Sequence, residues 1–211
     1  MARIVIAGAS GLTGLALTRC LAAADHEVIA VARRAAPPGL SPNVQWISAD
    51  VSAPGWTAAL PAQYDAVYAL FQSPDFRDFP AKATDVFQTN VAGLQELLGH
   101  ATNAACNRFV FTSTGGLYAP SPEPLVEDAL LTTAGPLGYY LTTKRCGELL
   151  VESYASQFST LITRPFFIYG PGQAGGMLMA RLIQSVSQTT GIALSGITST
   201  IVSLGTARQL E

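Results

Sequence analysis

A tyrosine and a lysine one helical turn apart are the residues of this chain best suited to proton transfer. The segment GYYLTTKRCGELL contains Tyr139, Tyr140 and Lys144. Tyr140 and Lys144 are four residues apart and share one face of a helix, whereas Tyr139 has Thr143 in that place. A phenol has a pKa of about 10, and a nearby ammonium group favours the phenolate and lowers that value. We therefore predict that Tyr140 is an acid/base and that Lys144 tunes it.

Three consecutive hydroxyl residues form a second candidate group. The segment RFVFTSTGGLY ends a predicted strand in Thr112, Ser113 and Thr114, and strand alternation puts Thr112 and Thr114 on one side. A hydroxyl at the end of a strand can hydrogen-bond a substrate carbonyl or alcohol while a tyrosine exchanges the proton. A tyrosine four residues before a lysine is a common helical pattern, however. An interface tyrosine beside a surface lysine has the same spacing.

A glycine-rich turn follows the first predicted strand. In GASGLTG, Gly8, Gly11 and Gly14 are spaced three apart between an apolar strand and a helical pattern. Glycine lets the backbone approach a pyrophosphate, and the start of the helix directs N–H groups at the anion. A tight structural turn needs glycine as well. The strand before it and the helix after it favour a dinucleotide site.

The end of the second predicted strand bears on the choice of cofactor. In AVARRAAP, Ala32 stands where an acidic residue could bind a ribose 2′-hydroxyl, and Arg33 and Arg34 follow. Arginine at this place can bind a 2′-phosphate, so the sequence favours NADP(H), with NAD(H) as the alternative. Asp50, after the third strand, is a candidate for the adenine amino group. Solvated loop charges are the competing interpretation of all three charged residues.

Strand-like and helix-like segments alternate along most of the chain. Strand character falls on residues 3–7, 27–32, 44–48, 65–71, 108–113 and 160–164, and helical periodicity on 11–24, 82–102 and 138–156. This alternation predicts an α/β, Rossmann-type doubly wound parallel sheet in three α/β/α layers. In such a sheet, the loops at the carboxyl ends of the strands form the ligand crevice.

The composition of the chain excludes several classes of function. The chain has 211 residues, 49% of them hydrophobic and 12% charged, and a formal net charge of -2 without a basic run. Neither nucleic acid nor a membrane surface is an expected partner. Three scattered cysteines and two histidines favour reduced thiols and give no support for a metal site. The sequence shows no signal-peptide pattern and no membrane span, which predicts a cytoplasmic location.

Five motifs in order carry a resemblance to a known family. GASGLTG, FQTNVAGLQELL, RFVFTSTGGLY, YYLTTK and RPFFIYGPGQ together resemble the extended short-chain dehydrogenase/reductases, the NAD-dependent epimerase/dehydratase group, over residues 3–181. The resemblance implies Thr114 as the substrate-orienting hydroxyl, Tyr140 as acid/base, Lys144 as its partner and as a ligand of the nicotinamide ribose, and Asn90 as a support of the active site. VARRAAP also resembles NADPH-using members related to plant progesterone 5β-reductases.

The resemblance also completes the set of expected cofactor contacts. Phe166 matches the loop over the nicotinamide, and ALFQSP matches the cofactor-facing turn after the fourth strand, where the family usually has small residues. The expected cofactor-binding residues are Gly8, Ser10, Gly11, Leu12, Gly14, Arg33, Arg34, Asp50, Val51, Leu70, Phe71, Gln72, Tyr140, Lys144 and Phe166.

The family contains several chemistries, which the motifs separate only in part. Gly115 and Gly116 stand where its 4,6-dehydratases carry an Asp-Glu pair, which indicates against dehydration. Epimerisation and carbonyl reduction both need only Thr114, Tyr140, Lys144 and the nicotinamide. The two arginines favour an NADP(H) reductase, whereas RPFFIYGPGQ favours a sugar-nucleotide epimerase. A non-catalytic dinucleotide sensor is a further alternative.

Members of this family have a C-terminal substrate domain that this sequence does not match in full. Residues 189–211 resemble the family hardly at all. We predict an NAD(P)-binding domain over residues 1–170 and a reduced remnant of the substrate-binding region over 171–211. A truncated cofactor binder and an enzyme completed by a partner subunit are both compatible with this pattern. The resemblance further implies a homodimer formed through the helices that carry Asn90 and Tyr140.

Overall fold

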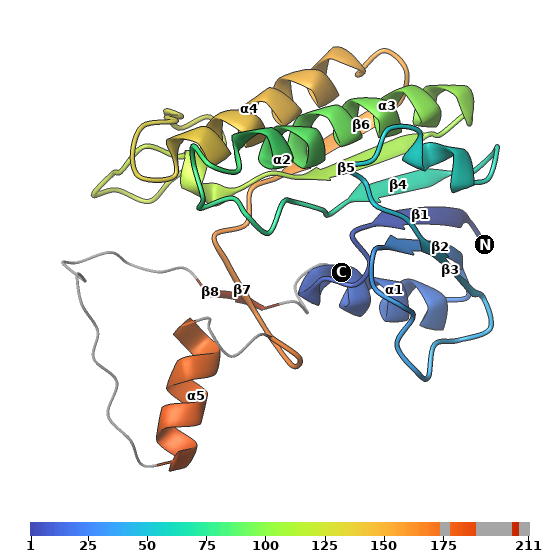
Figure 1. The fold of residues 1–211 in the computed structure, drawn as a ribbon, viewed down its shortest axis with the longest axis horizontal. Helices are drawn as coiled ribbons and strands as arrows, with labels where there is room; N and C mark the ends of the chain where they lie inside the picture. Colours follow the sequence, from blue (N-terminus) through green and yellow to red (C-terminus); the bar gives the residue numbers. More distant parts are fainter. Residues whose placement is uncertain (174–177, 189–203, 207–211) are drawn as a thin grey trace. The chain divides into compact units, whose positions relative to one another are not determined.

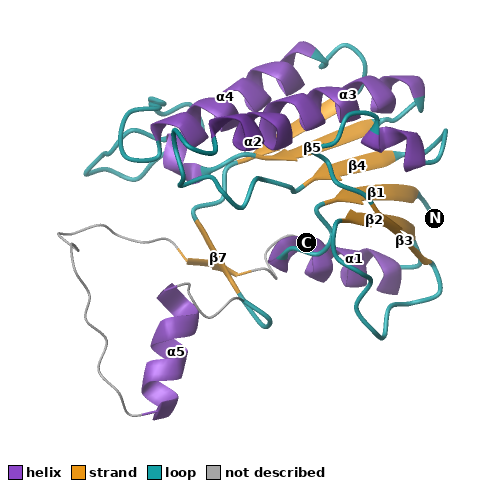
Figure 2. Cartoon of the chain, in the orientation of Figure 1, coloured by secondary structure: helices purple, strands orange, loops and turns teal. Residues whose placement is uncertain are grey.

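A six-stranded parallel sheet organises residues 1–164 of the computed structural model, which describes residues 1–173, 178–188 and 204–206 (Figures 1 and 2). The strands are Arg3–Ala7 (β1), Glu27–Ala32 (β2), Val44–Ser48 (β3), Ala66–Ala69 (β4), Arg108–Thr112 (β5) and Ser159–Thr163 (β6). Their order is β3-β2-β1-β4-β5-β6. The strand order reverses between β1 and β4, where sheets of this type bind their ligands. The predicted Rossmann-type α/β fold is confirmed.

Helices cover both faces of this sheet (Figure 1). Helix α1 (Leu12–Ala23) lies on one face, and α2 (Ala83–Phe87), α3 (Gly93–Asn103) and α4 (Gly138–Ser153) lie on the other. The predicted helix over 82–102 is one helical path, but a π-helical turn, Gln88–Ala92, separates α2 from α3. Such turns occur frequently at functional sites, and this one contains Asn90. Two short 3₁₀ turns, Trp56–Ala59 and Gly115–Leu117, complete the first unit.

The main core lies between the sheet and the α3–α4 layer. Leu94, Leu97 and Leu98 of α3 are fully buried together with Phe109 and Phe111 of β5. Leu94 and Leu98 therefore pack on the sheet. Phe87 at the end of α2 is 44% exposed instead.

Residues 165–211 form a second compact unit, which is described here by itself. It contains β7 (Phe167–Tyr169) paired in parallel with β8 (Leu204–Thr206), and helix α5 (Leu178–Gln188). Apart from β8, the tail 189–211 lies outside the described residues, and the functional boundary at residue 170 stays a prediction. None of the helices in the described part of the chain is long and apolar enough to cross a membrane.

Candidate active site

The glycine turn after β1 brings two backbone segments into close contact. Gly8 has a φ of 94°, a left-handed conformation that side chains rarely adopt, and a Cβ there would lie 2.8 Å from the Phe71 nitrogen. A Cβ on Gly14 would lie 2.8 Å from the Cα of Ala9. Both positions thus require glycine for steric reasons, and they hold the turn against the start of α1 and the end of β4.

Helix α1 begins beside this turn with an end suited to an anion. Its N-cap is Gly11, which makes no side-chain capping bond, and its first turn, starting at Leu12, contains no acidic residue. The free N–H groups and the positive dipole end are therefore available to a phosphate. Across the turn, the Arg34 guanidinium donates to the Ser10 carbonyl at 2.6 Å and to Ser10 Oγ at 3.3 Å.

The end of β3 adds an acidic group to the same edge. Asp50 accepts hydrogen bonds from the backbone nitrogen and Oγ of Ser52 at 3.0 and 2.8 Å. Burial acts to raise the pKa of Asp50, but the two bonds from Ser52 and the positive charge of Arg33 outweigh it and lower that pKa. Val51 is buried in the main core, so its side chain supports the loop. The glycine turn follows β1, the two arginines follow β2 and the aspartate follows β3. This is the order that we expect for groups around a bound adenosine.

The segment after β4 connects the glycine turn to the tyrosine. Leu70 donates its backbone N–H to the Ala7 carbonyl at 2.8 Å, and its side chain packs against the smaller core cluster of the α1 side. The Phe71 side chain is buried in the main core with its ring 6.3 Å from that of Trp56. Only the backbone of Phe71 is therefore placed to meet a cofactor. Gln72 extends from the next position, and its Oε1 accepts a hydrogen bond from the Tyr140 hydroxyl at 3.0 Å.

The two neighbouring tyrosines have different environments. Tyr139 donates to the Ala83 carbonyl at 3.0 Å and stacks on Phe79. Tyr140 is only 7% exposed, and its hydroxyl lies between Gln72 and Thr114. Burial raises the pKa of Tyr140, and the hydrogen bond with Thr114 acts in the opposite direction. In the chain alone, the pKa of Tyr140 is therefore raised. This is opposite in direction to the lowering that we expected from Lys144.

The two threonines at the end of β5 take different roles. Thr114 Oγ1 accepts a hydrogen bond from the Gly116 nitrogen at 3.2 Å and so caps the 3₁₀ turn while it lies beside Tyr140. Thr112 Oγ1 lies 3.4 Å from Thr163 Oγ1 of β6, and the Thr112 carbonyl accepts a bond from Lys144. Only Thr114 therefore presents its hydroxyl beside the tyrosine.

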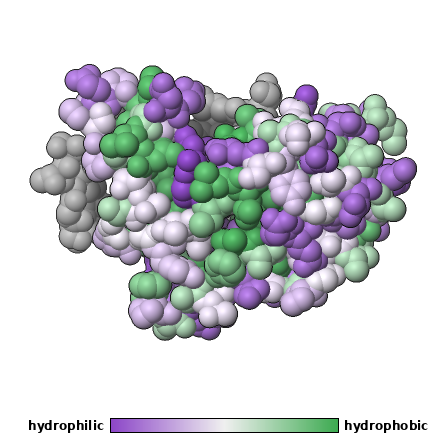
Figure 3. Space-filling model, turned by 90° about the horizontal axis from the view of Figure 1, so that it is seen from above, coloured by the Kyte–Doolittle hydropathy of each residue, from purple (hydrophilic) through white to green (hydrophobic). Residues whose placement is uncertain are grey.

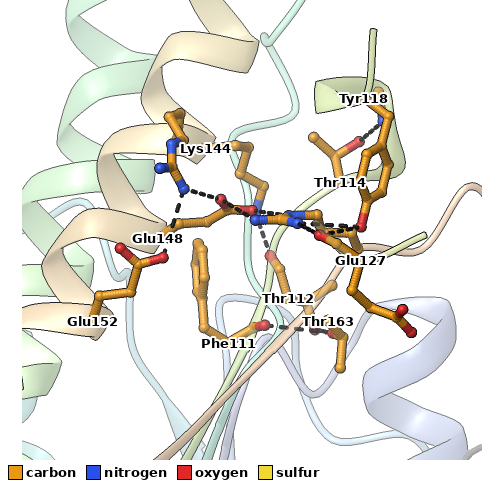
Figure 4. A network of polar contacts seen from close by, with 12 residues as sticks. Phe111, Thr112, Thr114, Tyr118, Glu127, Lys144, Glu148, Glu152 and Thr163 are labelled. Carbon is orange, nitrogen blue, oxygen red and sulfur yellow. Dashed lines mark hydrogen bonds and ion pairs between the residues drawn. The ribbon is translucent and has the colours of Figure 1, made fainter. Parts of the chain in front are cut away.

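Lys144 is buried, and its side chain points toward the Thr112 carbonyl at the end of β5 (Figure 4). The residue is only 2% exposed. Its Nζ donates a hydrogen bond to the Thr112 carbonyl at 2.7 Å and lies 5.0 Å from the centre of the Phe111 ring. Burial lowers the pKa of Lys144 to about 7, although the negative charge of Glu148 acts to raise it. Lys144 is thus one turn from both Tyr140 and Glu148 on α4.

Glu148 is the centre of an ion cluster that the sequence analysis did not single out (Figure 4). Its carboxylate accepts from Arg164 Nε and Nη2 at 2.7 and 2.9 Å and from Arg145 Nη1 at 2.7 Å. Burial would raise the pKa of Glu148, but the bonds from Arg164 and Arg145 lower it. Arg164 also donates to the Tyr118 hydroxyl and the Glu127 carbonyl. The cluster thereby joins α4 to the end of β6 and to the loop after β5.

Asn90 holds the site together without touching the tyrosine hydroxyl in any of the contacts described. Its Oδ1 accepts from the Ser73 nitrogen at 2.9 Å, and its Nδ2 donates to Thr143 Oγ1 at 3.0 Å. Thr143 in turn donates to the Tyr140 carbonyl at 2.7 Å. These contacts make Asn90 a positioning residue that joins the segment after β4 to α4.

The residues around the glycine turn fit a dinucleotide. A Cβ on Gly8 or Gly14 would meet the backbone of Phe71 or Ala9, so the turn is closely packed, and α1 presents uncapped N–H groups beside it. From this turn, Gly8 lies against Phe71, and the following residue, Gln72, binds Tyr140. The glycine turn and the candidate acid/base, Tyr140, are thus linked through one short segment at the carboxyl end of β4.

Comparison with known proteins identifies the family. The model of the NAD-dependent epimerase/dehydratase family matches residues 4–209. The chain belongs to this family. The match extends beyond residue 181, so the expectation that the tail carries almost no family resemblance was wrong. The motifs that we used stop earlier because the sequence of residues 189–211 contains neither a GxxGxxG pattern nor a Tyr-x-x-x-Lys pair by which it could be recognised.

Similar members of the epimerase/dehydratase family have sugar nucleotides in their names. An uncharacterised UDP-glucose epimerase, YtcB, from Bacillus subtilis is 33% identical over 109 residues, which are 51% of this chain and 34% of that protein. The UDP-glucose 4-epimerase of Erwinia amylovora is 32% identical over 46% of this chain and 29% of its own length. The structure of MoeE5 in complex with UDP-glucose and NAD has a TM-score of 0.84 at 25% identity, covering 99% of this chain and 69% of that one.

This chain matches about a third of the length of the first curated relative. The structures of relatives contain NAD, and the family is NAD(P)-dependent. Phe166 belongs to the second unit, so its expected contact with the nicotinamide stays a prediction.

Sequence reasoning missed the partners of the predicted residues more than the residues themselves. Gln72 was expected to face the cofactor, not to bind Tyr140, and Glu148 was not considered. The spacing Tyr140, Lys144, Glu148, four residues at each step, was the available signal for a third member on this helix face.

Proposed function

We propose that this chain catalyses NAD(P)-dependent hydride transfer at a secondary alcohol or carbonyl, with Tyr140 as the acid/base. The observation that carries the proposal is the buried Tyr140 hydroxyl, held between Thr114 and Gln72 and one short segment away from the glycine turn. A non-catalytic sensor would need the turn but not this arrangement of hydroxyls above a buried lysine.

The chain's own residues account for the movement of the proton. A bound nicotinamide would accept a hydride from the substrate carbon and return it. As the hydride leaves, the substrate hydroxyl gives its proton to the Tyr140 oxygen, and in the reverse direction Tyr140 returns the proton to the carbonyl oxygen. Thr114 donates a hydrogen bond to the same substrate oxygen and fixes its position. Lys144, Asn90 and the bonds that anchor them keep α4 in place under the reacting atoms.

A sugar nucleotide is the substrate class that the relatives support, and epimerisation is the reaction that we infer first. The similar proteins are named as acting on UDP-glucose or are solved with it. Thr114 is followed by Gly115 and Gly116 and not by carboxylates, so no acid pair for elimination stands in this turn. Simple carbonyl reduction is the second candidate, because the arginines after β2 favour an exchangeable NADP(H).

The test of Tyr140 uses its neighbour as a matched control. Tyr140→Phe should bind cofactor as tightly as wild type and lose turnover of UDP-glucose by about 10²–10⁴-fold, the usual contribution of a general acid/base. Tyr139→Phe removes a hydroxyl that binds only the Ala83 carbonyl and should retain most of the activity. Formation of the 4-epimer from UDP-glucose without net change in reduced nicotinamide would indicate an epimerase, whereas stoichiometric oxidation of NADPH in the presence of a carbonyl substrate would indicate a reductase. Full activity of Tyr140→Phe would refute the assignment.

We propose NADP(H) as the preferred cofactor, on the basis of Arg33 and Arg34. Arg34 lies across the turn at Ser10, and Arg33 is close enough to Asp50 to lower its pKa. Charge-assisted bonds to a 2′-phosphate are worth about 1.5–3 kcal/mol, or roughly 10- to 100-fold in affinity. Fluorescence titrations of wild type, Arg34→Ala and the α1 control Arg19→Ala with NADPH and NADH test this. Tighter binding of NADH by wild type, as the NAD in the relatives would favour, would refute it.

A homodimer through α2, α3 and α4 is the assembly that we propose. Phe87 and Leu149, on α2 and α4, are 44% and 48% exposed, and this helical side of the molecule mixes apolar with polar residues (Figure 3). Exposed apolar surface of this kind is suited to pairing with a second copy. Analytical ultracentrifugation of wild type and Leu149→Asp should show a dimer that the substitution dissociates. A monomeric wild type would refute the proposal.

A further inference from the structure

The amide of Gln72 is a partner of Tyr140 that no role assigned so far explains. Its Oε1 accepts the hydrogen of the tyrosine hydroxyl at 3.0 Å, although the two residues are 68 positions apart. The ring of Phe76 tilts against that of Tyr140 at 5.0 Å between centroids. The phenol is therefore enclosed by an aromatic ring, and its oxygen is left to Thr114 and Gln72.

The neighbours of Gln72 fix its position. Phe71 before it is buried in the main core, and Ser73 after it is almost fully buried with its backbone nitrogen bound to Asn90 at 2.9 Å. Gln72 itself is exposed. Its backbone is thus held on both sides while its side-chain amide can still turn about its last bond.

A carboxamide suits a phenol that changes its protonation state. A neutral tyrosine donates one hydrogen bond, whereas a phenolate only accepts. An amide offers an oxygen to the first and an NH₂ group to the second, without adding a charge. We propose that Gln72 is a positioning residue for Tyr140. The Gln72 amide accepts a hydrogen bond from the neutral phenol through Oε1 and donates one to the phenolate through Nε2. The proposal rests on the proposed function in that it takes Tyr140 as the acid/base.

Several charged groups lie on the elements around the tyrosine. Lys144 follows it on α4, Asp75 and Arg77 belong to the segment after β4, and Arg77 lies over the Phe76 ring. Asp85 on α2 is bound to a lysine, and the Gly115–Leu117 turn and the π-helical turn carry no charge. Because all of these stay unchanged in Gln72 variants, a change in the titration of Tyr140 can be traced to the amide.

The experiment measures ionisation of Tyr140 directly in the protein without cofactor. Site-specific incorporation of 3-fluorotyrosine at position 140 lowers the phenol pKa into an accessible range and reports ionisation by fluorine NMR. In Gln72→Glu the carboxylate only accepts and repels the phenolate, so the midpoint should rise by about one pH unit or more. In Gln72→Leu both bonds are lost without a new charge. Because a hydrogen bond to the charged phenolate is worth more than one from the neutral phenol, a smaller rise of about half a unit is expected.

A second glutamine provides the matched control. Gln95 Nε2 donates to the Tyr154 hydroxyl at 2.7 Å on the exposed side of α3, so Gln95→Glu makes the same change beside a different tyrosine. This variant should leave the Tyr140 midpoint within about 0.2 units of wild type. An unchanged or lowered midpoint in Gln72→Glu, with circular dichroism that matches wild type, would overturn the proposal.

The NMR titration and the turnover assay can each refute one proposal and leave the other in place. A raised midpoint in a protein that converts no substrate would refute the proposed function and leave the Gln72–Tyr140 coupling in place. Turnover that requires Tyr140, together with an unchanged midpoint in Gln72→Glu, would do the reverse. In an active enzyme, the pH at which the rate rises should move in the alkaline direction with the midpoint.

Discussion

Replacing the buried Lys144 should stabilise the protein at neutral pH while abolishing its proposed activity. An ammonium group loses hydration when it is buried, and burial lowers the pKa of Lys144 from 10.5 to about 7. The bond to the Thr112 carbonyl and the charge of Glu148 return only part of that loss. Lys144→Met keeps the length and volume of the side chain but removes the charge. This substitution therefore tests whether the lysine is retained at an energetic cost.

The magnitude follows from the size of the pKa change. One unit corresponds to about 1.4 kcal/mol, so the buried charge costs roughly 4–5 kcal/mol at the upper limit. The methionine gives up the hydrogen bond to the Thr112 carbonyl, which is worth about 1–3 kcal/mol including the carbonyl left without that partner. A net stabilisation of the Lys144→Met variant by about 2 kcal/mol at pH values below 7 is the expected result.

The pH dependence gives the sharper test. Between about pH 7 and 10.5 the unfolded lysine binds a proton that the folded one has lost, so wild-type stability rises with pH in this window relative to the variant. The penalty is fully present below the folded pKa and disappears above the unfolded one. The difference in unfolding free energy between Lys144→Met and wild type should therefore shrink by about 1 kcal/mol per pH unit within it.

Urea unfolding of both proteins at about pH 6, 8 and 10, followed by circular dichroism, measures this difference. Lys82→Met is the control, because Lys82 is half exposed and paired with Asp85 at 2.9 Å. It should leave the free energy of unfolding nearly unchanged, with little dependence on pH. If Lys144→Met were less stable than wild type at pH 6, and by an amount independent of pH, the description of Lys144 as a destabilising buried charge would be refuted.

Two further substitutions test the turn and the ion cluster. Gly14→Ala should cost at least about 2 kcal/mol and abolish NADPH binding, because its Cβ would meet the Ala9 backbone. The control Gly99→Ala has open space around it on α3 and should stabilise the protein by about 0.5–1 kcal/mol. Thermal unfolding measures both stabilities, and fluorescence titration measures NADPH binding. Glu148→Gln should cost about 2–4 kcal/mol in urea unfolding because it leaves the Arg164 charge without its carboxylate, and the exposed control Glu152→Gln should cost under about 1 kcal/mol. Since the pKa of Glu148 is lowered, the cost of Glu148→Gln should decline as the pH falls below the unfolded pKa of about 4; a cost that did not depend on pH would contradict this.

The sheet could be predicted because its signals are local. The apolar runs 3–7, 27–32 and 44–48 coincide with β1, β2 and β3 to the residue. Gly8 ends the first run, polar residues flank the second on both sides, and Asn43 precedes the third. The fourth run was predicted too long. Its last residues, Leu70 and Phe71, are as apolar as the strand but leave the sheet to pass the glycine turn at Gly8. Hydrophobicity indicates burial and does not separate a strand from a buried connection.

The candidate site was predictable as a set of residues but not as a set of contacts. The i, i+4 spacing selected Tyr140 over Tyr139, and in the structure the two hydroxyls bind different partners. Five elements, from α2 to the Gly115–Leu117 turn, lie between Gln72 and Tyr140, so no local pattern encodes their pairing. The π-helical turn at Asn90 was hidden for a related reason, because one extra residue per turn hardly changes helical periodicity over a segment of this length.

Burial shifts the pKa values of Tyr140 and Lys144 in directions that oppose the oxidation of an alcohol in the chain alone. It raises the pKa of Tyr140 and lowers that of Lys144, so both side chains are driven toward their neutral forms. A neutral phenol can give a proton to a carbonyl but cannot take one from an alcohol. Oxidation of an alcohol therefore requires a positive charge beside Tyr140, which an oxidised nicotinamide would bring. Reduction does not require it. If the site works as proposed, the alcohol-oxidising direction should depend more steeply on alkaline pH than the carbonyl-reducing direction, because only the former starts from the phenolate.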